Sequence, residues 1–110
     1  MDKKRILILE DDEIIQILYT KVLTDYHVTI VDNIADAIAM SETCEYDLYI
    51  VDLMFREEIG SGMDFIKTGI SPYIIVSAVQ LLPNNLENKI DYIRKPFRNK
   101  ELLEKIKELS

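Results

Sequence analysis

Short apolar runs punctuate the chain, and they are continuous or nearly so rather than alternating between apolar and polar positions. The four clearest runs cover residues 6–9, 27–31, 48–51 and 73–76. Runs of this length and character are typical of parallel strands that are covered on both faces. A fifth and weaker candidate, residues 90–94, is followed by Lys95-Pro96, and a proline takes the chain out of a strand ladder.

Helical spacing appears between the first two runs, between the second and third, and at the C-terminus. The positions that show it are Ile14, Ile15, Leu18, Val22 and Leu23, then Ile34, Ala37, Ile38 and Ser41, and finally Leu102, Leu103, Ile106 and Leu109. Asp12 and Glu13 suit the start of the first helix, and either Asp32 or Asn33 is available to cap the second. Strands that alternate with helices predict a doubly wound α/β fold with a parallel sheet and helices on both faces.

The middle of the chain carries a weaker helical signal. Gly60-Ser61-Gly62 breaks the stretch after Met54 and leaves only residues 63–68 for a helix, while Pro83-Asn84-Asn85 interrupts the following connection. We therefore expect the third and fourth helices to be short or irregular.

Composition narrows the class of protein. The chain has 110 residues, of which 48% are hydrophobic, and this predicts a single domain spanning 1–110 with a real core. A formal net charge of -7 disfavours direct binding of nucleic acid or of an anionic membrane surface. The N-terminal apolar run is too short for a secretion signal or a membrane span, so we expect a cytoplasmic protein without membrane insertion.

Polar residues follow the strand candidates in a pattern that suggests a site. Glu10-Asp11-Asp12 follow the first run, Asp52 the third, Ser77 the fourth and Lys95 the fifth. Because functional groups gather at the carboxyl edge of an open parallel sheet, these side chains should converge there. Several carboxylates without a neighbouring His or Cys favour a hard cation such as Mg²⁺ over zinc. The plainer interpretation is an acidic first helical turn and an ordinary loop aspartate.

At this point the chain resembles the receiver domains of two-component response regulators, of the chemotaxis-regulator type. The resemblance lies in four motifs in order, and it covers essentially the whole chain. The motifs are Ile6-Leu-Ile-Leu-Glu-Asp-Asp12, Asp47-Leu-Tyr-Ile-Val-Asp-Leu53, Ile74-Ile-Val-Ser-Ala78 and Asp91-Tyr-Ile-Arg-Lys-Pro-Phe97. It implies a flavodoxin-like, five-stranded parallel sheet in the order 2-1-3-4-5.

The resemblance also implies roles for the acidic residues. Asp52 would be the phosphoacceptor, and Glu10, Asp11, Asp52 and the backbone carbonyl of Met54 would bind Mg²⁺. Asp12 would then cap the first helix.

Roles for the remaining motif residues follow from the same resemblance. Ser77 would donate a hydrogen bond to a phosphoryl oxygen, Lys95 would pair with the phosphoryl group, and Pro96 would follow a cis peptide bond. Ser77 and Tyr92 would form the switch that changes position on activation.

We therefore expect a phosphoacceptor signalling domain, active only in its own phosphorylation and dephosphorylation, rather than an enzyme. Its phosphodonor would be a sensor histidine kinase or a histidine phosphotransfer protein, and its output would reside in a partner or in a longer parent chain. One alternative is a phosphorylation-independent pseudo-receiver that serves as an interaction module. Another, a Mg²⁺-dependent phosphohydrolase, is disfavoured because Met54 stands where such enzymes typically carry a second Asp.

The sequence departs from the usual receiver pattern after Asp52. The loop at residues 55–59 is charged and lacks the usual proline, and the spacings from Asp52 to Ser77 and from Ser77 to Lys95 are shorter than usual. Apolar Met54 and Val79 stand at positions that tune loss of the phosphoryl group, and they predict slow self-dephosphorylation.

Overall fold

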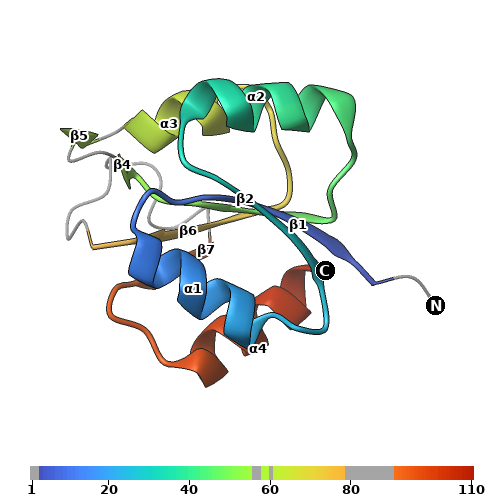
Figure 1. Cartoon of the computed structure of the whole chain (residues 1–110), viewed down its shortest axis with the longest axis vertical. Helices are drawn as coiled ribbons and strands as arrows, with labels where there is room; N and C mark the ends of the chain where they lie inside the picture. Colours follow the sequence, from blue (N-terminus) through green and yellow to red (C-terminus); the bar gives the residue numbers. More distant parts are fainter. Residues whose placement is uncertain (1–2, 56–57, 60, 79–90) are drawn as a thin grey trace.

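The fold is known from a computed structural model, which describes residues 3–55, 58–59, 61–78 and 91–110, with the backbone alone for 54–55, 58–59 and 61. A central sheet lies between two layers of helices (Figure 1). The last strand was predicted for residues 90–94, and in the described residues it covers Asp91–Arg94. The expected fourth helix falls on residues 79–90, which lie outside the described residues.

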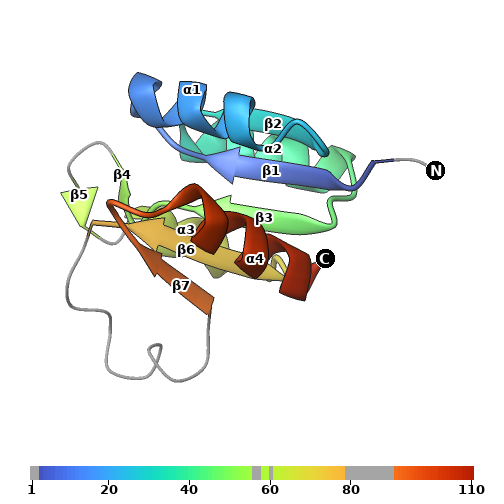
Figure 2. The same cartoon turned by 90° about the horizontal axis from the view of Figure 1, so that it is seen from below.

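The central sheet has five parallel strands in the order β2-β1-β3-β6-β7. In the order of the strands along the chain this is 2-1-3-4-5, so the predicted topology is confirmed (Figure 2). The strands are β1 (Arg5–Leu9), β2 (His27–Val31), β3 (Leu48–Val51), β6 (Tyr73–Ser77) and β7 (Asp91–Arg94).

Helices cover both faces of this sheet, as the continuous apolar strands require. The helices are α1 (Glu13–Val22), α2 (Ile34–Thr43), α3 (Ser61–Ile66) and α4 (Asn99–Leu109). Helices α1 and α4 lie on one face, and α2 and α3 lie on the other (Figures 1 and 2). Alternate residues of β1 supply the two cores: Ile6 and Ile8 pack on the α1 and α4 side, whereas Leu7 and Leu9 pack on the other.

The segment after β3 combines a confirmed expectation with an unexpected element. Helix α3 has six residues, in line with the predicted short third helix. A two-stranded antiparallel sheet precedes it, formed by β4 (Met54–Phe55) and β5 (Glu58–Ile59). Strands of two residues contain too few positions to show a period, which explains why the sequence pattern did not reveal them.

Candidate functional site

The sheet register brings the acidic residues together. Leu9 and Val51 are partners in the β1–β3 pairing, so Glu10 and Asp52, which follow them, leave the sheet side by side. Both are buried, with 1% and 5% of their surface exposed. Carboxylate oxygens of Glu10, Asp11 and Asp52 all lie within 4.8 Å of one another. The three carboxylates that the sequence singled out therefore form one cluster at the carboxyl edge of the sheet.

The acidic run after β1 divides into two functions. Asp12 caps α1, because its Oδ1 accepts hydrogen bonds from the backbone N–H groups of Ile14 and Ile15 at 2.8 and 3.3 Å. The Glu10 carboxylate belongs to the cluster with Asp52, and its Oε2 accepts a hydrogen bond from the Asp12 backbone N–H at 3.2 Å. An acidic helix turn thus accounts for Asp12 but leaves Glu10 and its buried carboxylate unexplained.

Lys95, which follows β7, contacts two of these carboxylates. Its Nζ lies 2.6 Å from Oε1 of Glu10 and 3.1 Å from Oδ2 of Asp52. The residue follows β7, and its backbone N–H donates to the Ser77 carbonyl at 2.9 Å. The peptide bond between Lys95 and Pro96 is cis.

Burial and charge shift the pKa values of this group. Burial raises the pKa of Glu10; the Lys95 ammonium lowers it and the Asp52 carboxylate raises it. For Lys95 burial acts to lower the pKa, but the contacts with Glu10 and Asp52 outweigh burial and leave it raised. Lys95 supplies the positive charge that a cluster of buried carboxylates requires.

The donor set also suits a divalent cation. The cluster offers carboxylate oxygens only, which favours a hard ion such as Mg²⁺ over the softer metals that prefer His or Cys. Met54, the other predicted ligand, begins β4 two residues beyond Asp52, and its carbonyl remains a predicted ligand.

Ser77 and Tyr92 lie on the neighbouring strands. Ser77 ends β6 and is fully buried, while the hydroxyl of Tyr92 on β7 donates a hydrogen bond to the Ser77 carbonyl at 3.2 Å. Burial raises the pKa of Tyr92, Arg94 lowers it, and Asp52 raises it.

Known proteins share this arrangement of strands and helices, although no family model matches the chain. The chain is 32% identical to Protein RcaC of Microchaete diplosiphon, in a match that spans 96% of the chain but 18% of that protein. A receiver domain of a sensor histidine kinase from Pseudomonas aeruginosa, solved with magnesium in its active-site cleft, is 25% identical. The match to that domain covers 98% of both chains with a TM-score of 0.79. A CheY-like response regulator receiver domain protein from Methanospirillum hungatei is 28% identical, with coverages of 97% and 93% and a TM-score of 0.80.

In sequence and in fold the chain is similar to the receiver domains of response regulators. The predicted resemblance is thereby confirmed.

Three further residues lie close to the acidic cluster without having been singled out from the sequence as members of a site. The Gln16 side-chain amide donates to the Glu10 carbonyl at 2.6 Å. Gly62 lies so close to Asp52 that a Cβ at this position would collide with the Asp52 backbone carbonyl. Tyr19 is buried beneath the cluster, and its pKa is raised well above the ordinary value by burial and then by Glu10 and Asp52. Gln16 and Tyr19 lie on α1, and the helical spacing of apolar residues had already predicted that helix. No feature of a single sequence shows that Gly62 is needed for the close approach of the backbone to Asp52.

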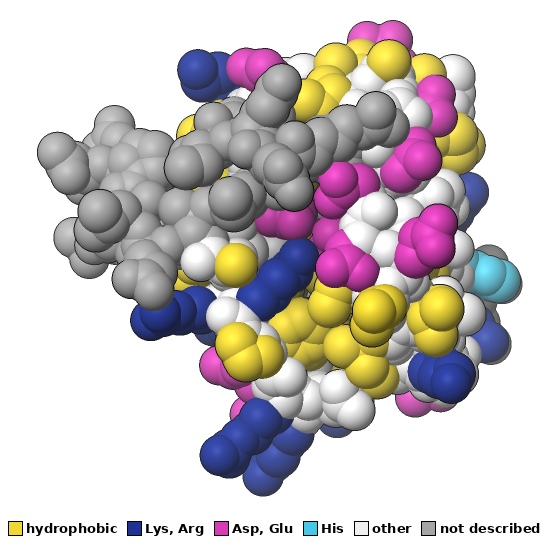
Figure 3. All heavy atoms as spheres, turned by 60° about the vertical axis from the view of Figure 1, so that its left-hand side comes forward, with side chains coloured by type: hydrophobic (Ala, Val, Ile, Leu, Met, Phe, Trp, Pro, Cys, Tyr) yellow, Lys and Arg dark blue, Asp and Glu magenta, His cyan; other side chains and the backbone are white. Residues whose placement is uncertain are grey.

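The face of the molecule that carries the cluster is both acidic and apolar. Acidic side chains gather there beside a basic one, and hydrophobic side chains adjoin them (Figure 3). On α1 the large exposed hydrophobic residues are Ile14 and Ile17, with 76% and 55% of their surface exposed. None of the helices in the described part of the chain has the length and apolar character needed to cross a bilayer.

Proposed function

We propose that the receiver domain accepts a phosphoryl group on Asp52 from a phospho-histidine donor, in a reaction that depends on Mg²⁺. The observation that carries this proposal is the buried Asp52 carboxylate, which lies within 4.8 Å of two further carboxylates and 3.1 Å from the Lys95 ammonium. A single nucleophile surrounded by cation ligands and one fixed ammonium suits the transfer of a highly charged group.

The chemistry requires little from the protein beyond position and charge. An oxygen of the Asp52 carboxylate forms a bond to phosphorus as the bond between phosphorus and the donor imidazole nitrogen breaks, and that nitrogen keeps the electron pair. Glu10, Asp11, Asp52 and the Met54 carbonyl would hold Mg²⁺. The bound ion would supply positive charge to the phosphoryl oxygens. The magnesium in the Pseudomonas receiver domain supports this choice of ion.

Lys95 and Ser77 would complete the site around the phosphoryl group. The Lys95 ammonium already contacts Asp52, so it needs little movement to pair with a phosphoryl oxygen on that residue. Ser77 is fully buried on the adjacent strand and would donate through its hydroxyl. Because Tyr92 is hydrogen-bonded to the Ser77 carbonyl, movement of Ser77 towards the phosphate would change the packing of Tyr92 and the surface around it.

The partners follow from the same proposal. The donor would be a sensor histidine kinase or a histidine phosphotransfer protein in the cytoplasm. The exposed Ile14 and Ile17 lie on α1, the helix that begins directly after the acidic run, and they offer the donor an apolar contact. The output partner would read the surface near Tyr92. The chain itself would act as a switch, with no turnover beyond its own phosphorylation and dephosphorylation.

A mass measurement tests the proposal directly. We expect incubation with Mg²⁺ and a small phosphodonor such as acetyl phosphate to add the mass of one phosphoryl group. The Asp52→Asn variant should show none, because the amide is a poor nucleophile. Asp25→Asn, which changes an exposed loop carboxylate, is the matched control and should be phosphorylated normally.

The alternative, a pseudo-receiver that works without phosphorylation, makes the opposite prediction. If the wild-type protein gains no phosphoryl mass and beryllofluoride with Mg²⁺ leaves its NMR spectrum unchanged, the phosphoacceptor proposal is wrong. Equal phosphorylation of wild type and Asp52→Asn would place the acceptor elsewhere.

A further inference from the structure

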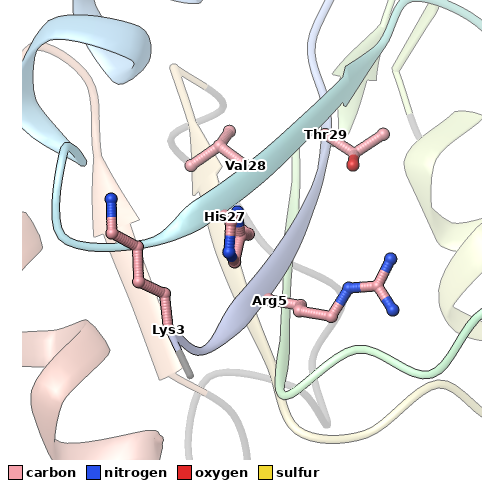
Figure 4. Close-up of a pocket in the computed structure, with 5 residues that line it drawn as sticks. All are labelled: Lys3, Arg5, His27, Val28 and Thr29. Atoms are coloured by element: carbon pink, nitrogen blue, oxygen red, sulfur yellow. The ribbon is translucent and has the colours of Figure 1, made fainter. Parts of the chain in front are cut away.

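A second group of charged residues lies at the other edge of the sheet, where β1 and β2 begin. Lys3, Arg5 and His27 line an open cavity of about 460 Å³ together with Val28 and Thr29. In Figure 4, His27 lies between Lys3 and Arg5, and Thr29 lies on the same side as Arg5. The cavity therefore combines three basic side chains with one hydroxyl donor, from β1, β2 and the residues directly before β1.

The charges of this basic pocket are not neutralised within the described part of the chain. Neither Lys3 nor Arg5 forms an ion pair there; Lys3 Nζ donates to the Thr24 carbonyl at 3.1 Å. The nearby Asp47 carboxylate accepts a hydrogen bond from the Arg5 backbone N–H at 2.7 Å rather than from its guanidinium. Two cations without a carboxylate partner among the described residues thus line one cavity.

The sheet register places two of the basic side chains next to each other. Arg5 and His27 are direct partners in the parallel β1–β2 pairing. An anion between the two side chains would accept hydrogen bonds from the guanidinium and from an imidazole N–H. The arrangement thus offers a physical reason for an anion to bind here.

The residues behind the pocket fix the position of Arg5. Its guanidinium lies over the ring of Tyr46, with 5.4 Å between the guanidinium carbon and the ring centroid. The Tyr46 hydroxyl is buried and has no hydrogen-bond partner among the described residues. Burial raises the pKa of Tyr46, and the neighbouring Thr29 and Arg5 offset only part of this rise. The exposed Arg5 side chain therefore has one aromatic contact that favours a particular position of its guanidinium.

We propose that this basic pocket binds a small, multiply charged oxyanion of the phosphate or polycarboxylate type. Its volume suits a small ligand, and its donors are two permanent cations, an imidazole and a hydroxyl. The pocket lies at the amino edge of the sheet, whereas Asp52 lies at the carboxyl edge, so a ligand there does not compete with phosphorylation. The proposal does not depend on Asp52 being the phosphoacceptor.

An NMR titration of the whole chain tests it. Inorganic phosphate and, separately, citrate are added to metal-free protein at constant ionic strength, with sodium chloride as the comparison. We expect saturable shifts of the backbone amides of residues 3–5 and 27–29 with at least one of the two anions. Preference for phosphate or for citrate identifies the type of oxyanion.

Substitutions locate the site. Lys3→Gln, Arg5→Gln and His27→Gln should each weaken binding by about two- to fivefold, the usual effect of removing one exposed charge. Arg5→Lys keeps the charge without the contact over Tyr46, so it separates loss of charge from local disturbance and should bind more tightly than Arg5→Gln. Lys107→Gln, which removes an exposed cation on α4, is the matched control and should bind as the wild type does.

Two results would overturn the proposal. One is the absence of saturable shifts at the amides that surround the pocket. The other is an equal loss of affinity in Lys107→Gln and in the pocket variants, since this would show a general effect of net charge.

Discussion

The two edges of the central sheet hold charged groups in opposite physical settings. At the carboxyl edge Glu10 and Asp52 are buried, and both contact the Lys95 ammonium. At the amino edge Lys3 and Arg5 are exposed, and neither has a carboxylate partner within the described residues. The charges at the carboxyl edge thus form an ion-pair network inside the protein, whereas Lys3 and Arg5 at the amino edge are exposed to solvent.

This difference determines what each edge contributes. Charges in a low-dielectric setting interact strongly, and removal of one partner leaves another buried without compensation. Exposed charges are screened by water and salt, so they contribute little to stability and remain available to a ligand. The carboxyl edge should therefore be sensitive to substitution in its fold as well as its function, whereas the amino edge should tolerate substitution.

The largest expected contrast comes from a pair of glycines. Gly62 lies against the Asp52 carbonyl at the carboxyl edge, while Gly69, close to the start of β6, has a φ of 96° and open space where a Cβ would stand. Gly62→Ala must displace backbone, and we expect it to lower the free energy of unfolding by about 3 kcal/mol, at the upper end of over-packing effects. Gly69→Ala adds only left-handed strain, about 1–2 kcal/mol.

Urea denaturation of both variants measures this contrast. A Gly62→Ala protein as stable as Gly69→Ala would mean that α3 shifts freely away from β3, and that the carboxyl edge is less tightly packed than the structure indicates. Gly62→Ser should be at least as destabilising as Gly62→Ala, since it adds the same Cβ.

The second contrast compares two lysines. We expect Lys95→Met to lower the free energy of unfolding by about 2–3 kcal/mol at neutral pH, because Glu10 and Asp52 then share a buried site without their cation. Partial exposure of Lys95 keeps the effect below that of a fully buried pair. Lys3→Met, its counterpart at the amino edge, should change stability by less than about 0.5 kcal/mol.

Addition of Mg²⁺ sharpens this test. Removal of the Lys95 ammonium leaves Glu10 and Asp52 without their cation, so it should raise the affinity of the cluster for Mg²⁺. Since an ion that binds the native state adds to its stability, Mg²⁺ should stabilise Lys95→Met more than it stabilises wild type. Mg²⁺ should leave the difference in free energy of unfolding between Lys3→Met and wild type unchanged. Equal stabilisation of all three proteins would argue against a cation site among Glu10, Asp11 and Asp52.

The sequence predicted the carboxyl edge much better than the amino edge. Acidic residues directly after apolar runs are a strong signal, because parallel strands must deliver their ends to one edge of the sheet. The amino edge offered no such signal: His27 stood alone at the start of a strand, and only the register shows that it faces Arg5. Gly62 and the pair of two-residue strands escaped prediction for a related reason, since close backbone approach and very short strands leave no periodic pattern.

Helix capping shows the same limit at smaller scale. The pattern left Asp32 and Asn33 equally available to cap α2, and the structure selects Asn33, whose Oδ1 accepts a hydrogen bond from the Asp36 backbone N–H at 2.8 Å. Both residue types serve at this position, so the local angle of the chain decides between them. Whether a segment is a helix or a strand follows from its composition and from the spacing of its apolar residues. Which of two adjacent polar residues caps the helix depends on the three-dimensional structure around it.

The smallest expected contrast is in alkaline stability, and it compares a tyrosine near each edge. Burial raises the pKa of both Tyr19 and Tyr46; Glu10 and Asp52 raise that of Tyr19 further, while Thr29 and Arg5 lower that of Tyr46. Above the ordinary tyrosine pKa of 10.0 the unfolded chain loses these protons while the folded protein keeps them, so stability falls as pH rises. We expect Tyr19→Phe to reduce this slope by up to about 1.4 kcal/mol per pH unit, and Tyr46→Phe to reduce it over a narrower range. Urea unfolding between about pH 9 and 12 measures both slopes, and equal effects of the two substitutions would contradict an electrostatic difference between the edges.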